Sequence, residues 1–409
     1  MMRETTDILV VGAGLSGLAA AVRLHEAGRE VLVVDAADAV GGRVRTDRVD
    51  GFLLDRGFQV FLDAYPESGR LLDLPALRLQ PFEPGALLWN RGRLRPLMDV
   101  FRRPGALAAS ALHPAGNLFD KLRVARLRSR LLRKAPDAIW NSPEMPTLAL
   151  LRQEGFSERF IDHFFRSFYG GIFLESELET SGRLFEFTFA MFARGSATLP
   201  ADGMQAIPEQ LAARLPPDTL RLGTRVLSLS GNVAQTDRGE IAARRTVLAV
   251  DGSSAAELFP ARPRVGWKRT ACLYYEAPAA PFPEKLIALR GDRGGPVHNL
   301  CVPSSIAPSY APSGKVLVSA SVIGPDCESS DLEERVSHDL GEWFGPETLG
   351  WRHLATYRID RALPAATPGH AATTCAATAD EPLVCGDHTS SASIEGAILS
   401  GLRAAAALL

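Results

Sequence analysis

The sequence predicts an α/β fold, in which a Rossmann-like dinucleotide-binding domain carries an α+β substrate domain formed by two insertions. A glycine-rich turn, GAGLSG at residues 12–17, lies between two short aliphatic runs near the N-terminus, as in a βαβ unit. A Gly-Asp pair follows another aliphatic run near the opposite end of the chain, at residues 383–387. The 409 residues exceed the length of one ordinary hydrophobic core, so we expect a second domain.

The first βαβ unit is expected within residues 8–35. The run 8–11 is typical of a strand buried on both faces, residues 18–27 have helical spacing, and the run 31–34 predicts a second strand ending at Asp35. Such a turn brings backbone N–H groups and a helix N-terminus against a pyrophosphate, while the acid accepts from a ribose hydroxyl. A purely structural glycine turn without a ligand is the alternative. The candidate contacts of this unit are Gly12, Gly14, Leu15, Ser16, Gly17 and Asp35.

A second glycine-rich element, GGRVRT at residues 41–46, follows the acid. It contains Gly42, Arg43 and Arg45; a guanidinium makes charge-assisted contacts with a diphosphate, and adjacent glycines allow close approach. NAD-dependent dehydrogenases do not need this element. With it, the chain resembles the flavin amine oxidase superfamily, which includes monoamine and polyamine oxidases, protoporphyrinogen oxidase and phytoene desaturases.

The resemblance implies a discontinuous FAD-binding domain of the GR2 type, with the two glycine motifs and the acid holding FAD. It also implies that Gly57, Phe58 and Gln59, in the segment DRGFQ, run beside the flavin ring. The segment around Val226 resembles the family strand that presents a backbone group to the adenine.

The C-terminal motif agrees with the same cofactor. The resemblance implies that Asp387, after Gly386, lies at the ribityl or phosphate end of FAD. It also implies that the helix opened by SIEGA at 393–397, with Ile394, faces the pyrimidine ring. A helix N-terminus suits the negative charge of a reduced flavin. No cysteine or histidine lies in the attachment context of the family, so non-covalent FAD is expected.

The expected FAD domain comprises residues 1–65, 198–260 and 355–409, and the expected substrate domain comprises 66–197 and 261–354. The resemblance is strong in the first and last pieces, moderate in 198–260 and weak in both insertions. In the middle piece we expect a helix at 204–214 and strands at 220–229 and 241–250.

The first insertion contains a basic segment. Residues 91–134 hold twelve Arg or Lys against Asp99 and Asp120 only, and 118–134 predicts a helix. One reading is a peripheral contact with a membrane surface through 121–134, which gives access to a lipid-soluble substrate. The other is a solvated helix face. The arginines expected on this face are Arg123, Arg126, Arg130 and Arg133.

Aromatic residues concentrate at 156–192. Phe160, Phe164 and Phe168 follow a Ser157 cap at helical spacing and form one stripe, which is either core or the wall of a substrate cavity. The pair at 170–171, Gly-Gly, is expected to break this helix and to admit a ligand or another backbone.

Composition excludes several classes. The net charge of -2 argues against a nucleic-acid binder, and the five scattered cysteines indicate a reducing compartment without a zinc site. No apolar run is long enough to span a membrane, and no signal peptide is visible. We therefore expect a cytoplasmic protein, at most peripheral at the inner membrane surface, and no metal.

The predicted function is that of an FAD-dependent oxidoreductase that removes hydride from an apolar organic substrate, of the desaturase or protoporphyrinogen-oxidase type. An amine oxidase is one alternative, and a flavin-dependent isomerase or non-catalytic flavoprotein is another. Against the first alternative, Thr270 occupies the place of the lysine that amine oxidases of the superfamily carry, with Lys268 two residues earlier. Ser393 stands where those oxidases have a tyrosine. No catalytic residue is identified from the sequence.

Overall fold

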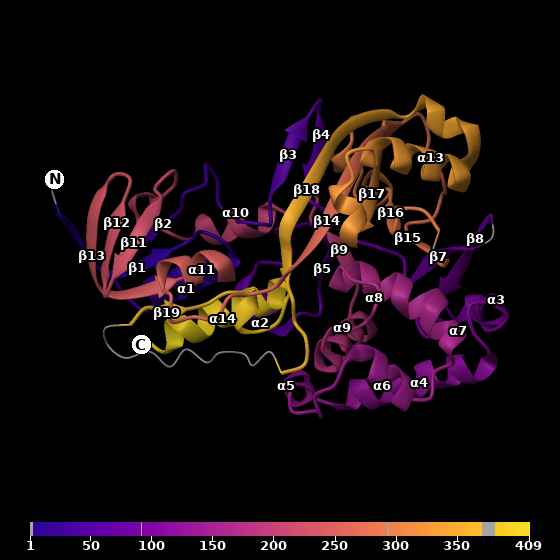
Figure 1. Ribbon diagram of the computed structural model, residues 1–409, viewed down its shortest axis with the longest axis horizontal. Coiled ribbons are helices and arrows are strands. Elements are labelled where there is room, and N and C mark those ends of the chain that lie inside the picture. Colours follow the sequence, from indigo (N-terminus) through magenta and orange to yellow (C-terminus); the bar gives the residue numbers. More distant parts are fainter. Residues whose placement is uncertain (1–2, 91, 293, 370–380) are drawn as a thin grey trace.

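Two seven-stranded sheets and a helical cluster form most of the computed structural model, which describes residues 3–90, 92–292, 294–369 and 381–409 (Figure 1). The first sheet has seven strands, in the order β10-β2-β1-β13-β12-β11, with β19 pairing β13. Around β1 the pairing is parallel, whereas β11, β12 and β13 form an antiparallel meander. The strands are β1 (Arg3–Val11), β2 (Val31–Val34), β10 (Leu220–Arg221), β11 (Val226–Ser230), β12 (Val233–Thr236), β13 (Gly239–Leu248) and β19 (Leu383–Val384).

Apolar residues cover both faces of this sheet, as the aliphatic runs predicted. Ile8 and Val10 pack toward α1 (Leu15–Glu26), while Leu9 and Val11 belong to a second cluster on the other face. Helix α14 (Ile394–Ala406) lies beside α1 (Figure 1). A Cβ on Gly401 would lie 2.1 Å from the backbone oxygen of Ser16, so this helix contact requires glycine. Shorter helices α2 (Pro66–Leu71), α10 (Ala206–Ala212) and α11 (Gly252–Leu258) complete this part.

The second sheet also has seven strands, in the order β18-β14-β17-β16-β15-β7-β8. One face packs on α13 (Leu332–Phe344) through residues such as Leu273, and the other face, with Cys272 and Tyr274, joins the core shared with the first sheet. The strands are β7 (Gly85–Asn90), β8 (Arg93–Met98), β14 (Trp267–Ala277), β15 (Ile287–Arg290), β16 (Asn299–Cys301), β17 (Val316–Ile323) and β18 (Arg352–Pro364).

The expected domain boundary at residue 355 falls inside β18, because this strand continues its pairing with β14 from Arg352 to Pro364. Smaller elements lie between the sheets. They are the hairpin β3 (Thr46–Val49) and β4 (Phe52–Asp55), and a small sheet of β5 (Phe61–Leu62), β6 (Gln80–Pro81) and β9 (Ala197–Leu199). In the middle piece the expected strand 220–229 is divided into β10 and β11, with a turn at Gly223, whose φ is 61°.

Apart from α2, the helices of the first insertion gather at the end of the molecule opposite α1 and β1 (Figure 1). Helix α4 begins with a capping box, in which the side chains of Asn117 and Asp120 each accept from the other residue's backbone N–H. The helices are α3 (Leu107–Ala111), α4 (Leu118–Arg133), α5 (Pro136–Ile139), α6 (Thr147–Gln153), α7 (Glu158–Phe160), α8 (Arg166–Phe173) and α9 (Gly182–Arg194).

The aromatic stripe follows a helix with one π-helical section, at Ile161–Phe165. The Ser157 side chain caps α7 as predicted, accepting from the N–H of Phe160. The prediction that Gly170 and Gly171 break the helix is wrong, because α8 continues through both to Phe173. Their missing side chains leave room for His298 and Asn299, whose atoms would lie 3.0 Å from a Cβ at each position.

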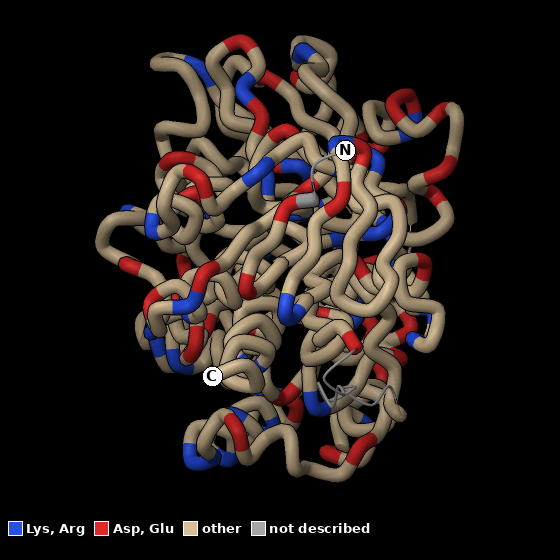
Figure 2. Tube along the Cα trace, turned by 90° about the vertical axis from the view of Figure 1, so that its left-hand side faces the viewer, with Lys and Arg blue, Asp and Glu red and all other residues tan. Residues whose placement is uncertain are grey.

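Charges are mixed over the surface. Figure 2 shows Lys and Arg interspersed with Asp and Glu along the trace seen from this side. Among the described residues, no helix is both long and apolar enough to cross a bilayer.

Candidate functional site

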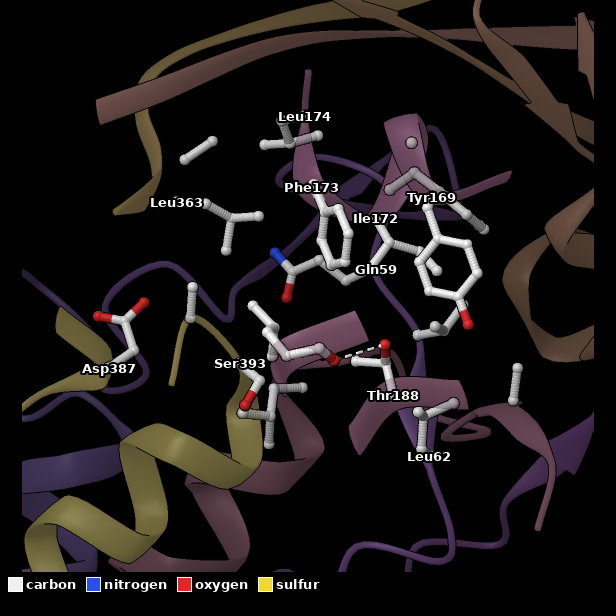
Figure 3. Close-up of a pocket in the computed structure, with 18 of the residues that line it drawn as sticks. Gln59, Leu62, Tyr169, Ile172, Phe173, Leu174, Thr188, Leu363, Asp387 and Ser393 are labelled. Atoms are coloured by element: carbon white, nitrogen blue, oxygen red, sulfur yellow. Dashed lines mark hydrogen bonds between the residues drawn. The ribbon is translucent and has the colours of Figure 1, made fainter. Parts of the chain in front are cut away.

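A cavity of about 1370 Å³ extends from the glycine turn to helix α4. Figure 3 shows part of it, with Asp387 and Ser393 on one side and Gln59, Ile172, Tyr169 and Thr188 on the other. Most of the predicted contact residues line this cavity: Gly12, Gly14, Leu15, Ser16, Asp35, Gly42, Arg43, Gly57, Phe58, Gln59, Val226, Gly386, Asp387 and Ile394. The other two predicted contacts, Gly17 and Arg45, are not among the described residues that line the cavity.

The glycine turn holds the start of α1 tightly against β1. Gly12 has a φ of +110°, and a Cβ there would lie 2.5 Å from the Ala249 oxygen. A Cβ on Gly17 would lie 1.9 Å from the Gly12 oxygen, so Gly17 serves helix–strand packing and not ligand contact. Gly14 has open space around its missing Cβ. The first N–H groups of α1, at Leu15 and Ser16, therefore meet the cavity without intrahelical partners, as in an anion site.

Asp35 closes the turn from the end of β2. One carboxylate oxygen accepts from the N–H of Ala13 at 2.6 Å, and the other accepts from the N–H of Ala37 at 2.7 Å. Each carboxylate oxygen has a further lone pair. The acid is thus fixed in orientation and still able to accept from a hydroxyl in the cavity.

Arg43 and Arg45 have different surroundings. The Arg43 guanidinium donates to Asp387 at 2.7 Å and to the Ala362 oxygen at 2.9 Å. Arg45 pairs with Asp38 at 2.7 Å. Gly42 has a φ of +60°, and a Cβ built on it would lie 3.5 Å from the Cα of Gly14. The turn at residues 41–46 therefore packs directly against the turn at residues 12–17. The two glycine motifs therefore meet at one wall of the cavity.

The DRGFQ segment contributes both to the cavity wall and to the core. Gly57 has a φ of +90°, and the Gln59 amide donates to the Arg43 oxygen at 2.9 Å. Asp55 is buried below the cavity and accepts from the Thr46 hydroxyl, the Met204 N–H and the Tyr310 hydroxyl at 2.5, 3.0 and 2.9 Å. Burial raises the pKa of this carboxyl to about 6, although the hydrogen bonds oppose the shift.

The C-terminal motif places α14 at the cavity. The Ser393 hydroxyl caps the helix by accepting from the Gly396 N–H at 2.9 Å. Glu395 points elsewhere: its carboxylate accepts from the N–H groups of Glu67 and Ser68 and from the Ser68 hydroxyl, which fixes the N-terminus of α2. Sequence reasoning missed this contact, because no local pattern connects residues 67 and 395.

The far part of the cavity has an aromatic and aliphatic wall. Phe164 stacks between Phe160 and Phe168 at centroid distances of 5.2 and 5.7 Å. All three rings line the cavity; Phe160 is also fully buried in the core, whereas Phe164 and Phe168 are half-buried. The stripe is therefore both core and cavity wall. Further apolar lining comes from Leu62, Ile172, Leu184, Phe189 and Phe192.

The two positions that distinguish amine oxidases also lie in the described structure. Thr270 and Ser393 both line the cavity. Lys268 is not among the cavity residues in the described ranges. These ranges also contain no cluster of His, Cys, Asp and Glu that would hold a metal ion. Cys272, Cys301, Cys327 and Cys385 are buried and form no disulfide with one another, and Cys375 lies outside the described residues.

Comparison with protein families places nearly the whole chain in one group. The family described as flavin containing amine oxidoreductase matches residues 15–409.

Two curated relatives are named coproporphyrinogen III oxidase. The one from Propionibacterium freudenreichii subsp. freudenreichii is 40% identical over 94 residues, which cover 22% of this chain and 18% of the relative. The one from Mycobacterium leprae is 31% identical over 173 residues, which cover 41% of this chain and 37% of the relative. The matches thus span well under half the length of these relatives.

A solved structure supports the fold over the full length. A provisionally assigned protoporphyrinogen oxidase from Exiguobacterium sp. 255-15 superposes with a TM-score of 0.77 and 20% identity, covering 100% of this chain and 99% of that chain.

Proposed function

Because the chain belongs to the flavin-containing amine oxidoreductase family, we propose that it binds FAD non-covalently in a discontinuous domain of the GR2 type. We further propose that it is an FAD-dependent oxidoreductase that removes hydride from an apolar organic substrate, of the desaturase or protoporphyrinogen-oxidase type. The observation that carries this proposal is one continuous cavity, which joins the dinucleotide turn to the aromatic wall.

The residues present fit FAD. The open N-terminus of α1 suits a diphosphate, Asp35 suits a ribose hydroxyl, and the edge of β11 at Val226 suits the adenine. Residues 57–59 and the N-terminus of α14 at Ile394 would lie along the flavin ring. When bound, a flavin supplies the hydride acceptor.

The residues of the chain itself bind the substrate and exclude water from it. Phe164, Phe168 and Phe189 present an apolar wall that excludes water from the reacting face. The few polar groups there include the Thr188 hydroxyl, which donates to the Leu184 oxygen at 2.8 Å, and the Gln59 amide, which is held by backbone oxygens. This aromatic part of the lining selects by shape more than by hydrogen bonding.

An amine substrate fits this cavity poorly. Thr270 stands at the expected lysine position and Ser393 at the expected tyrosine position, and both line the cavity. An aromatic face attracts an ammonium group, whereas a serine hydroxyl does not offer the same site.

Anaerobic reduction of the holoprotein tests the proposal. We expect bleaching of the flavin absorbance by a porphyrinogen or a polyene and no bleaching by primary amines or polyamines. Reduction by an amine alone would favour the amine oxidase alternative. Dithionite reduction without reduction by any member of the panel would favour the isomerase or non-catalytic alternative.

We also propose a peripheral membrane contact at the α4 end of the cavity. Leu118, Phe119 and Leu122 are 60%, 67% and 58% exposed, and two of them, Leu118 and Leu122, line the cavity opening. The arginine face expected at 121–134 is partly occupied, since Arg123 pairs with Asp120 and Arg130 pairs with Glu154 and Glu186. The apolar N-terminal half of α4 is therefore the better membrane-facing element.

A further inference from the structure

Helix α4 presents two cations to the cavity, at Lys121 and Arg128. We propose that these residues bind a carboxylate of the substrate, so that the substrate class is an apolar body with an anionic end. This inference rests on the proposed function and names the substrate class of the same site.

Lys121 is the first observation. Its Nζ atom is buried and has no hydrogen-bond partner among the described residues, and it lies 4.6 Å from the centroid of the Phe160 ring. The neighbouring Asp120 carboxylate is already engaged by the N–H groups of Asn117 and Ser157 and by the Ser157 hydroxyl. Burial lowers the pKa of the Lys121 ammonium, with Asp120 opposing the shift and Arg159 adding to it. A buried cation without a partner costs free energy that an incoming anion would recover.

Arg128 is the second observation. One of its terminal nitrogens donates to the Ala193 oxygen at 3.0 Å, its Nε has no partner, and its guanidinium carbon lies 4.8 Å from the Phe101 ring centroid. No carboxylate of the described residues pairs with Arg128, although Arg123 and Arg130 of the same helix do have such partners. The acids near α4 thus pair with cations outside the cavity and leave the two cavity cations without a carboxylate partner.

The spacing of the two residues supports a shared role. They are seven residues apart, which is two helical turns or about 10 Å along one face. Leu122 and Ala125 lie between them on the cavity side. A substrate with two carboxylates on one edge would reach both cations, and a substrate with one carboxylate would pair with either.

Other charges at this end do not cancel the two cations. Arg102 lines the cavity and donates to the Gly195 oxygen and the Ser196 hydroxyl, so it adds positive charge. Of the acids lining this end, Glu83 is paired with Arg103. Asp99 accepts from the Phe101 N–H and keeps its negative charge, which the cations Arg102, Lys121 and Arg128 outnumber. The local field therefore favours a carboxylate, is indifferent to a hydrocarbon end and repels an ammonium group.

Paired probes in the holoprotein test the inference without turnover. Protoporphyrin IX is compared with its dimethyl ester, and dodecanoate with dodecan-1-ol, by fluorescence or calorimetric titration. We expect the acids to bind about ten- to a hundredfold more tightly than the neutral compounds. Lys121→Met and Arg128→Gln should each remove much of this preference. Arg126→Gln, an exposed arginine of the same helix outside the cavity lining, is the matched control and should retain it.

Each outcome decides the inference. Equal binding of the acid and neutral members of both pairs, or a preference that survives in the Lys121→Met/Arg128→Gln double variant, would overturn it. Lys121→Arg should restore the preference, which a merely structural role would not predict. These titrations do not require flavin reduction, so failure of the proposed redox function would show separately as a flavin that no panel substrate bleaches.

Discussion

Arg43 and Asp387, 344 residues apart in the chain, form an ion pair of 2.7 Å beside the glycine motifs. The Asp387 side chain is 6% exposed and the Arg43 side chain is 35% exposed. Because the two residues belong to the first and last pieces of the expected FAD domain, the pair joins these pieces at the cavity wall. We predict that Arg43→Ala weakens FAD retention by about 1.5–3 kcal/mol, because a charge-assisted contact is lost and a buried carboxylate is left unpaired. The fraction of flavin retained after gel filtration, and the FAD dissociation constant, measure this effect.

A double-mutant cycle separates the two causes. The double variant Arg43→Ala/Asp387→Asn should lose less FAD affinity than the sum of the losses in the two single variants, because the unpaired charge is removed. Strictly additive losses would show that the pair is not coupled.

Glu395 links the C-terminal motif to α2 rather than to the cavity. Glu395→Ala should lower the free energy of unfolding by about 1–3 kcal/mol, because two backbone N–H groups and one hydroxyl lose their acceptor. Glu395→Gln keeps one acceptor oxygen and should cost less. Urea unfolding of the three proteins measures the order, and equal stability of the alanine and glutamine variants would contradict it.

Asp55 makes the stability depend on pH. The folded-state pKa of the Asp55 carboxyl, about 6, lies above the ordinary value of 3.8. The folded protein therefore holds the carboxyl proton of Asp55 more tightly than the unfolded chain does. The resulting stabilisation is complete below the ordinary pKa and is lost as the pH rises through the folded-state pKa.

Asp55→Asn removes this titration. The unfolding free energy of the unmodified protein relative to the variant should therefore fall between about pH 4 and about pH 7 and then stay constant. Urea titrations across this range test the sign. Parallel stability profiles for the two proteins would place the pKa of Asp55 near its ordinary value.

Lys268 is predicted to have no part in flavin chemistry. It lies outside the described cavity lining, whereas Thr270 faces the cavity. Lys268→Met should leave the rate of anaerobic flavin bleaching by a porphyrinogen or polyene unchanged. Rapid bleaching by a primary amine that this substitution abolishes would restore the amine oxidase alternative.

The membrane contact is predicted to depend on exposed apolar residues. Leu112, which directly follows α3, is 85% exposed, and neither it nor Phe119 of α4 belongs to the cavity lining. Leu112→Ser combined with Phe119→Ser should therefore weaken binding to phosphatidylserine vesicles by about 1 kcal/mol per residue, because less apolar surface enters the bilayer interface. Sedimentation at low and high salt measures it. Leu349→Ser, at an equally exposed leucine after α13, is the control. If the unmodified protein does not bind the vesicles at low salt, the membrane contact is wrong and the exposed face of α4 is simply solvated.

Local patterns were sufficient to predict the elements from β1 to β2 at the start of the chain. Aliphatic runs, glycine turns and the acid at the end of β2 depend on backbone geometry within a few residues, so they can be read from the sequence. The Ser157 cap and the α4 helix were predicted for the same reason. The continuity of the helix through Gly170 and Gly171 was not predicted, because the side chains that pack there, His298 and Asn299, come from the start of β16 and the residue before it, far away in the chain.

The sequence by itself determined the family resemblance, the FAD expectation and the αβ order of the first unit. Only the tertiary structure decided which charges are satisfied. Arg43 meets Asp387, Glu395 caps α2, and Arg130 is paired while Lys121 is not. The physical reason is that the cost of a charge depends on its burial and on its nearest opposite charge, and both are set by residues far away in the chain.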